Sequence, residues 1–423
     1  MSIKKIIFLI AVTLGSIISL SSCSKESSEE HLPEINKKVL KEIRIKTLPE
    51  KLIYTLEEDL NIDKMVVEGV YDDNSVSEIK IRKEDISGFS SETAIEKLPL
   101  TLTIQKQKAS FEIQVLPLRV KEGVLLKIEG EIKELTLPSS VKAIGDKVFY
   151  NNNKIETVIL NEGVTSIGEL AFAWSGIKSV IFPKSLEHIG EAAFYSCNAL
   201  QVADLKNTRL TVIENEVFTL SGIKELSLPE SLKRIKSQAF MNTENLSEII
   251  LPRHLEAIEI EAFRESGCRT IQLPNNLKSI ESRAFYLAPN LERAETYGEY
   301  YPDNNFNQAR RMDNSCFERC PKLTFLSIPD GIEAIGQSIL NSSPNVHELI
   351  IPASVREISF SAFGYSGLKE VEVKATTPPV ANTIHGQWYG FPSNILSIKV
   401  PTTAVDAYKN ASGWSEFSAS ISD

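Results

Sequence analysis

Apolar and polar positions recur with a constant spacing from about residue 120 onward. The segments SLPESLKRIKSQAF, ILPRHLEAIEIEAF and QLPNNLKSIESRAF each carry Leu-Pro, then Leu, Ile and Ala-Phe at the same offsets, with polar residues between them. The closing position recurs after 22 to 24 residues in every step but one, which takes 32. It is occupied in turn by Phe149, Phe172, Phe194, Phe218, Phe240, Phe263, Phe285, Phe317, Leu340 and Phe363.

One unit of this pattern predicts one coil of a stack. Ile223, Leu226 and Leu228 have the spacing of side chains that point inward from a short strand. Pro229 ends that strand because proline cannot donate to a sheet ladder, and Phe240 closes the coil. A single coil cannot bury these residues, whereas stacking on both neighbours does. The pattern therefore predicts a solenoid whose strands form a parallel sheet.

The strands should also present an outward column between their last two inward residues. We expect this column to form an exposed concave face. Its isoleucines are explained either by their preference for β-strands alone or by scattered apolar contacts with a ligand. The column reads Thr136, Ile159, Ile181, Asp204, Ser227, Ile250, Gln272, Glu295, Ser327, Ile350 and Glu372.

Residues 37–117 follow another pattern. Short segments with period-two alternation, such as EIRIKTLP and ASFEIQVL, are separated by Asn, Asp, Gly and Ser, which predicts an antiparallel β-sandwich. The stretch from IKTLPEKLIYTL through ISGFSS to FEIQV resembles a bacterial immunoglobulin-like domain. Such a domain implies either a spacer or a binding module.

The repeat consensus, L-x-x-[IVL]-x-[IVL]-P followed by [VL]-x-x-I-G-x-x-A-F, resembles the BspA-like leucine-rich repeat family of bacterial surface proteins. The resemblance assigns residues 118–400 to repeats, with an insertion near 298–316 and a C-terminal cap at 401–423. It implies a mainly β chain with short helical turns on the side opposite the parallel sheet. It also implies ligand binding, often to host proteins or other cells, without catalysis.

The N-terminus has the features of a secretory signal. Residues 1–22 contain two lysines, an apolar run and small residues, and Cys23 follows in LSSC. LSSC resembles a lipobox, which implies lipid attachment at Cys23 and membrane anchoring without a span. The polar segment 23–36 should be a flexible tether. Its lysine and glutamates resemble the export signal of Bacteroidetes surface lipoproteins, which places the chain on the outer membrane, exposed at the cell surface.

Composition narrows the chemistry. The formal net charge of −10 argues against a nucleic-acid partner. The chain has no glycine-rich phosphate loop, HExxH or G-x-S-x-G motif, so we predict no enzyme, no cofactor and no metal. Cys197, Cys268, Cys316 and Cys320 lack the spacing of a zinc site and are predicted to be core thiols.

Two loops carry the candidate ligand-binding residues. The insertion supplies Tyr300, Tyr301, Phe306, Arg310 and Arg311, and a later loop supplies Trp388 and Tyr389. Tyr, Trp and Arg dominate protein hot spots, and exposed aromatic rings can stack on sugars. The aromatic residues could instead fold back and plug the solenoid. The predicted function is macromolecular binding in adhesion or host and cell protein interaction; the alternative is a glycan-binding accessory of a polysaccharide uptake system.

Overall fold

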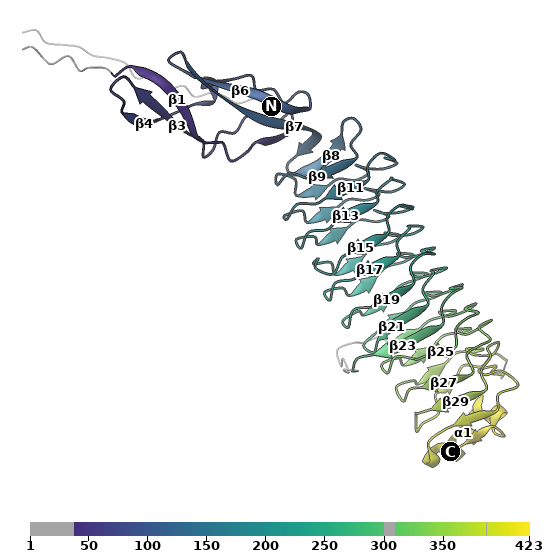
Figure 1. The fold of residues 1–423 in the computed structure, drawn as a ribbon. Helices are drawn as coiled ribbons and strands as arrows, with labels where there is room; N and C mark the ends of the chain where they lie inside the picture. Colours follow the sequence, from purple (N-terminus) through teal and green to yellow (C-terminus); the bar gives the residue numbers. More distant parts are fainter. Residues whose placement is uncertain (1–37, 300–308, 386) are drawn as a thin grey trace, which may run out of the picture.

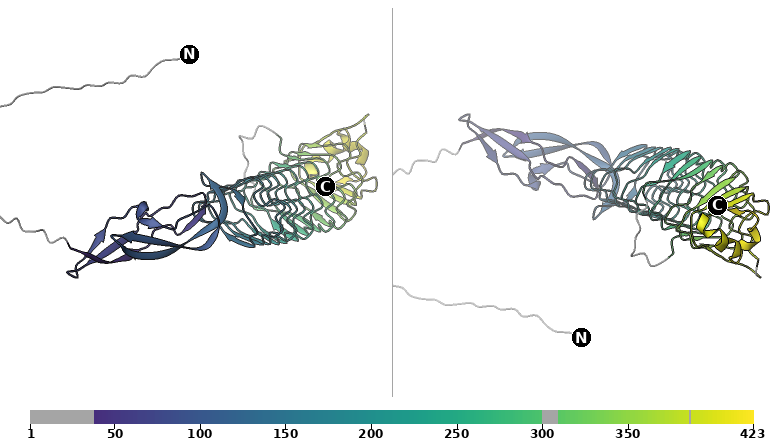
Figure 2. Two further views of the ribbon diagram at one scale, coloured as in Figure 1. Left: turned by 90° about the horizontal axis from the view of Figure 1, so that it is seen from above. Right: turned by 90° about the horizontal axis from the view of Figure 1, so that it is seen from below.

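The computed structural model describes residues 38–299, 309–385 and 387–423, and they form an elongated, mainly β molecule (Figure 1). An N-terminal β unit is followed by a solenoid, and the two further views show the unit continuing from one end of the stack of coils (Figure 2). Tyr300, Tyr301 and Phe306 of the predicted site lie outside the described residues. Within the described residues, every helix is too short or too polar to cross a membrane.

The N-terminal unit contains two sheets that share one apolar core. One sheet has the order β1-β3-β4, and the other joins β5, β6 and β7, with β2 paired to β7. The core takes side chains from both sheets, among them Ile43, Val67 and Phe111. Its elements are β1 (Leu40–Thr47), β2 (Ile53–Leu56), β3 (Val66–Tyr71), β4 (Val76–Ile79), η1 (Lys83–Asp85), β5 (Ile86–Ser87), β6 (Ile95–Ile104) and β7 (Gln107–Lys121).

The long strand β7 belongs to both parts of the molecule. Val115 lies in the N-terminal core, whereas Leu118 of the same strand lies in the solenoid core. β7 pairs antiparallel with β8 (Val124–Ile128), which pairs in parallel with the first short strand of the solenoid, β10 (Ala143–Ile144). The two parts are therefore joined by continuous hydrogen bonding rather than by a linker.

The solenoid has a first column of strands, the odd-numbered ones, which pair in parallel as the repeat pattern predicts. They alternate buried and exposed side chains, as in β13, where Val180 is buried between two exposed residues. The column contains β9 (Glu134–Thr136), β11 (Thr157–Ile159), β13 (Ser179–Ile181), β15 (Val202–Asp204), β17 (Glu225–Ser227), β19 (Glu248–Ile250), β21 (Thr270–Pro274), β23 (Arg293–Tyr297), β25 (Phe325–Leu326), β27 (Glu348–Ile351), β29 (Glu370–Val373) and β31 (Ser397–Lys399).

A second column of two-residue strands follows the proline turn of each coil. In most of these strands the second residue is the buried isoleucine of the repeat, and successive strands pair in parallel except between β14 and β16. Besides β10, the column contains β12 (Ser166–Ile167), β14 (His188–Ile189), β16 (Val212–Ile213), β18 (Arg234–Ile235), β20 (Ala257–Ile258), β22 (Ser279–Ile280), β24 (Arg311–Met312), β26 (Ala334–Ile335), β28 (Glu357–Ile358) and β30 (Val380–Ala381).

The expectation of helical turns on the far side of the coils is wrong. Between β8 and β31 the described residues contain no helix, because left-handed residues recur four positions apart around the closing residues from Phe149 to Leu340. Gln238 and Asn242 have φ of 58° and 55° on either side of Phe240, and a left-handed residue cannot continue a right-handed helix. The turn amides bond to the next coil instead: Phe240 N–H donates to Ala262 O at 2.8 Å.

The closing phenylalanines form a continuous stack inside the solenoid. From Phe149 to Phe317 each ring lies 4.6–5.6 Å from the next, with interplanar angles of 6–13°. Leu340 takes the next position, and a second stacked pair, Phe363 and Phe391, follows at 5.6 Å. Phe391 is thus a closing residue that the repeat pattern did not reveal. The stacked rings are buried, so each contributes apolar burial to two coils at once.

Four coils carry a glycine three residues before their odd-numbered strand, where it approaches the backbone of the preceding coil. A Cβ on Gly222 would lie 2.1 Å from Asn198 O, and one on Gly267 would lie 1.9 Å from Glu244 O. The strands that follow the four glycines all pair with the preceding odd-numbered strand. The ladder opens only before coils with a side chain at this position: Ala199 before β15, Asn245 before β19 and Asn345 before β27. The four glycines are Gly176, Gly222, Gly267 and Gly367.

The C-terminal segment covers the last coil. It contains η2 (Thr402–Ala404), α1 (Val405–Asn410), η3 (Trp414–Phe417) and β32 (Ile421–Ser422), and β32 pairs with β31. Tyr408 and Trp414 are buried there, and Tyr408 Oη donates to Ala375 O at 2.9 Å. The open end of the apolar stack is therefore closed by aromatic side chains, which a solenoid needs for solubility.

Candidate functional site

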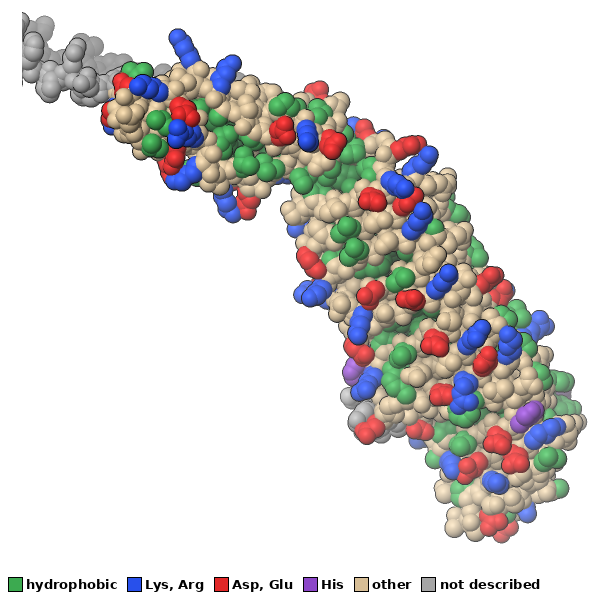
Figure 3. Space-filling model, viewed as in Figure 1, with side chains coloured by type: hydrophobic (Ala, Val, Ile, Leu, Met, Phe, Trp, Pro, Cys, Tyr) green, Lys and Arg blue, Asp and Glu red, His purple; other side chains and the backbone are tan. Residues whose placement is uncertain are grey.

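The odd-numbered strands present the outward column in the predicted register. Thr136, Ile159 and Ile181 are direct partners across three strands, and Ile350 lies opposite Glu372 of the next strand. Several of these isoleucines are exposed without polar partners: Ile250 is 65% exposed and Ile350 is 55% exposed. The space-filling view shows hydrophobic side chains recurring down this face between acidic and basic ones (Figure 3).

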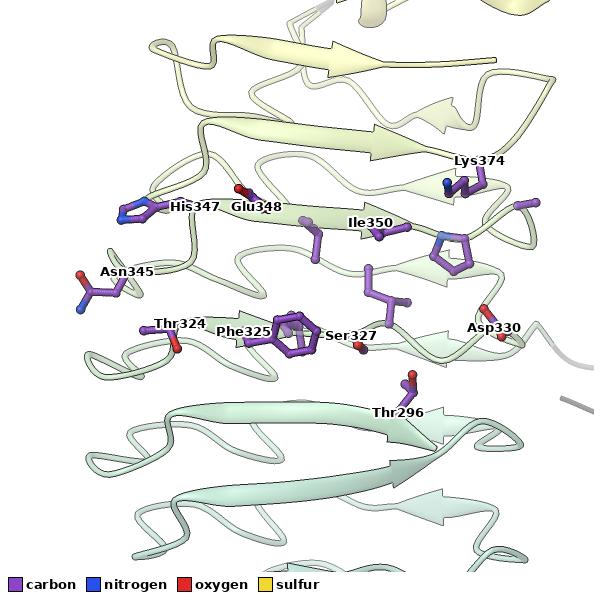
Figure 4. A pocket seen from close by; sticks show the side chains of 15 residues that line it. Thr296, Thr324, Phe325, Ser327, Asp330, Asn345, His347, Glu348, Ile350 and Lys374 are labelled. Carbon is purple, nitrogen blue, oxygen red and sulfur yellow. The ribbon is translucent and has the colours of Figure 1, made fainter. Parts of the chain in front are cut away.

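This face is hollowed where the ladder opens between β25 and β27. β25 pairs with β23 over only two residues, and β27 begins a new sheet. A hollow of about 820 Å³ lies here, lined by residues of four successive coils from Thr296 to Lys374 (Figure 4). Its position coincides with three successive coils that lack the close-approach glycine, which carry Asn290, Lys322 and Asn345 instead.

The hollow has an apolar centre. The Phe325 ring, 40% exposed, and the exposed Ile350 both line it, on either side of the opened ladder. The Arg293 guanidinium lies 4.4 Å from the centroid of the Phe325 ring and also forms an ion pair with Glu295. A cation over a ring face fixes the orientation of the ring. Phe325 is therefore held in place while part of its surface still faces solvent.

Polar and charged side chains surround that centre. Asp330 is fixed by Asn275, which donates from Nδ2 at 3.3 Å and accepts the Asp330 N–H at 3.2 Å. Lys374 forms an ion pair with Glu372, and His347 Nδ1 lies 3.0 Å from Gly367 O. An apolar centre within a polar rim is the anatomy of a protein-binding patch.

The insertion residues that the structure describes do not gather into one site. Arg310 is buried at 4% exposure and lines a second hollow of about 740 Å³ with Arg253 and Lys278. Arg311 stands on β24 and forms an ion pair with Asp313 at 3.2 Å. The two neighbouring arginines thus face different surroundings.

The two candidate residues of the later loop, Trp388 and Tyr389, also have different surroundings. Trp388 is fully buried among Phe391, Trp414 and Phe417, and its Nε1 donates to Ser359 O at 3.3 Å. It therefore offers no ring face to a ligand, and it packs inside the end of the solenoid. Tyr389 is half exposed, with its hydroxyl 2.6 Å from Gln387 Oε1.

The four described cysteines are core residues, as predicted. All are free and buried, and burial raises the pKa of Cys197, Cys268 and Cys320 to about 12 and that of Cys316 well above its ordinary value. A thiol that stays protonated is neither a nucleophile nor a metal ligand. Among the described residues no cluster of His, Cys, Asp and Glu could hold a metal ion.

Sequence reasoning missed the residue at the centre of the hollow. Phe325 occupies the first outward position of its strand, where Glu248 and Glu348 stand in other coils. An aromatic residue at an outward position just after the one irregular step of the repeat was the available signal.

Comparison with protein families identifies the repeats. The model described as "BspA type Leucine rich repeat region (6 copies)" matches residues 127–247, 211–307, 233–369 and 302–390. Together these matches span residues 127–390, which is more than half of the chain. A search of curated proteins found no significant match.

Three solved bacterial structures match this chain at low sequence identity. A leucine-rich repeat protein from Bacteroides ovatus is 17% identical, with 91% of this chain and 98% of that chain covered and a TM-score of 0.44. The pneumococcal vaccine antigen PcpA is 15% identical, with 87% and 97% covered and a TM-score of 0.37. A leucine-rich cell surface protein from Faecalibacterium prausnitzii is 17% identical, with 74% and 92% covered and a TM-score of 0.31.

Proposed function

Because the chain belongs to the BspA-type leucine-rich repeat family, we propose that it is a non-catalytic binding protein whose odd-numbered strand face holds a protein ligand. The observation that carries this proposal is the hollow between β25 and β27, where Phe325 and Ile350 line one recess although the fold does not require either to be exposed. Exposed apolar area of this kind within a polar rim marks interaction sites.

The hollow has room for several side chains of a protein partner. Its volume of about 820 Å³ lies within the range of preformed ligand sites. The rest of the face would supply the surrounding contacts, because Ile250 and Ile181 lie exposed on the same side. Acidic residues outnumber basic ones on its outward positions, with Glu225, Glu248, Glu348 and Glu370 among them. A partner surface with basic and apolar residues is complementary to this pattern.

The proposal includes the location of the protein. Signal residues 1–22 and lipidation at Cys23 would anchor the chain in the outer membrane. The N-terminal β unit would then hold the solenoid away from the lipid, as a bacterial immunoglobulin-like spacer does. The continuous pairing of β7, β8 and β10 supports a fixed connection between this unit and the solenoid.

The binding test uses the purified full chain in detergent against a panel of extracellular matrix and serum proteins and a glycan array. We expect a protein ligand, and we expect Phe325→Ala to raise its Kd about tenfold or more, as for a hot-spot residue. Leu126→Ala, which removes an exposed apolar side chain on β8, serves as the control. Binding to glycans alone, or protein binding unchanged in Phe325→Ala and Ile350→Asp, would refute the proposal.

Location is tested on intact cells. A membrane-impermeant label should reach the chain without lysis, and Cys23→Ala should release the chain from the membrane fraction. Labelling that requires lysis would place the chain in the periplasm.

A further inference from the structure

Three aromatic side chains form a ridge on the turn side of the first coils. Tyr150, Trp174 and Tyr195 follow β10, β12 and β14, one in each of three successive coils. The Trp174 ring lies 5.3 Å from that of Tyr150 and 4.8 Å from that of Tyr195, centroid to centroid. Tyr150 is 46% exposed and Trp174 is 41% exposed. The chain has three tryptophans, and the other two, Trp388 and Trp414, are fully buried.

The position of Trp174 is unfavourable for such a residue. It has φ of 56°, at the left-handed turn position two residues after the closing phenylalanine. Other coils place residues of several types at this point with the same backbone: Asn151 and Asn242, but also Leu220, Leu287 and Arg319. Asn tolerates the left-handed region far better than a bulky side chain does. The backbone therefore does not select a tryptophan here, and the core does not account for Trp174 either, because the residue is 41% exposed.

The surroundings of the ridge indicate the chemistry of its ligand. Asn151 and Ser196 directly follow Tyr150 and Tyr195 in the sequence, so the neighbouring positions carry an amide and a hydroxyl group. A pyranose ring has an apolar face of C–H groups and a rim of hydroxyls, so it can pack on an aromatic face and bond to such polar groups at the same time. A protein interface would need a much larger continuous patch than three rings.

We propose that Tyr150, Trp174 and Tyr195 form a carbohydrate-binding site, separate from the hollow between β25 and β27. The rings are tilted by 67° and 47° to one another, so they do not form a flat platform. The site therefore takes a short soluble oligosaccharide, or the end of a chain, rather than the flat surface of an insoluble polysaccharide.

The test uses the purified full chain on an array of host, plant and bacterial glycans, followed by titration of the soluble glycan that binds best. Trp174→Asn is the decisive variant because it installs the residue that other coils carry in the same backbone conformation, so the fold is retained. We expect its Kd to rise about tenfold or more. Tyr365→Ala is the matched control, since Tyr365 is an exposed aromatic residue at the equivalent turn of a distant coil.

Tryptophan fluorescence gives an independent readout. Trp174 is the exposed fluorophore, so glycan binding should shift the emission to shorter wavelength and protect it from a soluble quencher, and both effects should vanish in Trp174→Asn. No binding anywhere on the array, glycan binding unchanged in Trp174→Asn, or a loss confined to a protein ligand would each overturn the proposal.

Discussion

Replacing Phe240 by alanine tests how the phenylalanine stack holds the solenoid together. The ring is fully buried and stacks on Phe218 at 5.6 Å and on Phe263 at 5.1 Å. Deleting a buried Phe costs about 3–5 kcal/mol. We expect the upper half of that range, because the cavity opens toward two neighbouring coils. Phe240→Leu keeps most of the apolar volume, as Leu340 does naturally, and loses only two ring pairs, at about 0.5–1.5 kcal/mol each.

Amide hydrogen exchange is the suitable assay, since a repeat protein can open locally and one global free energy need not describe it. Protection should fall most at the inter-coil bonds around the cavity, from Phe218 N–H to Ala239 O and from Phe240 N–H to Ala262 O. The bond from Phe363 N–H to Gly390 O should keep its protection. Tyr365→Ala, at an exposed position, should stay within about 0.5 kcal/mol of the parent. A loss below about 1 kcal/mol for Phe240→Ala, or one spread evenly along the chain, would refute the reasoning.

Two further predictions concern single side chains. Gly267→Ala should destabilise its coil by about 3 kcal/mol, because the added Cβ would lie 1.9 Å from Glu244 O; unchanged hydrogen-exchange protection at Gly267 N–H would contradict this. Burial, followed by repulsion from Glu259 and Asp313, raises the pKa of the Glu281 carboxyl above its ordinary value of 4.5. Ionisation of Glu281 therefore weakens the fold as pH rises from 4.5 through the raised value. Glu281→Gln should be more stable than the parent in urea unfolding at pH 7 and lose that advantage below pH 4.5; an equal advantage at both pH values would contradict the assignment.

The parts of the fold that the sequence predicts are those repeated in every coil. Burial selects the same residue type at the same offset in each coil. The recurrence of Phe240 therefore predicts the stack of rings, and the recurrence of Ile235 predicts the second inward-facing segment of the coil. The turns escaped prediction because their left-handed positions accept many residue types, including Gln238, Glu261 and Trp174. No single residue type marks the left-handed turns, and the repeat pattern therefore predicts helical turns there.

The candidate sites were harder to predict because exposure depends on packing between distant segments. Trp388 and Tyr389 are adjacent in sequence, yet one is buried by the C-terminal segment and the other is half exposed. Tyr150, Trp174 and Tyr195 are separated by more than twenty residues and meet only because the coils stack. Their contact requires the register of the coils, which the repeat spacing provides once Phe149, Phe172 and Phe194 are aligned.

The close-approach glycines connect the number of coils to the shape of the surface. From β11 to β23, coils with and without the glycine alternate, and then β23, β25 and β27 follow one another without it. Loss of one glycine-bearing coil from an alternating array leaves one junction between coils that lack the glycine. The three coils here form two such junctions, and the hollow lies at the second. Deletion of whole repeats from such an array can therefore reshape the surface without any point mutation. Substitutions such as phenylalanine at position 325 could then adapt the recess to a ligand.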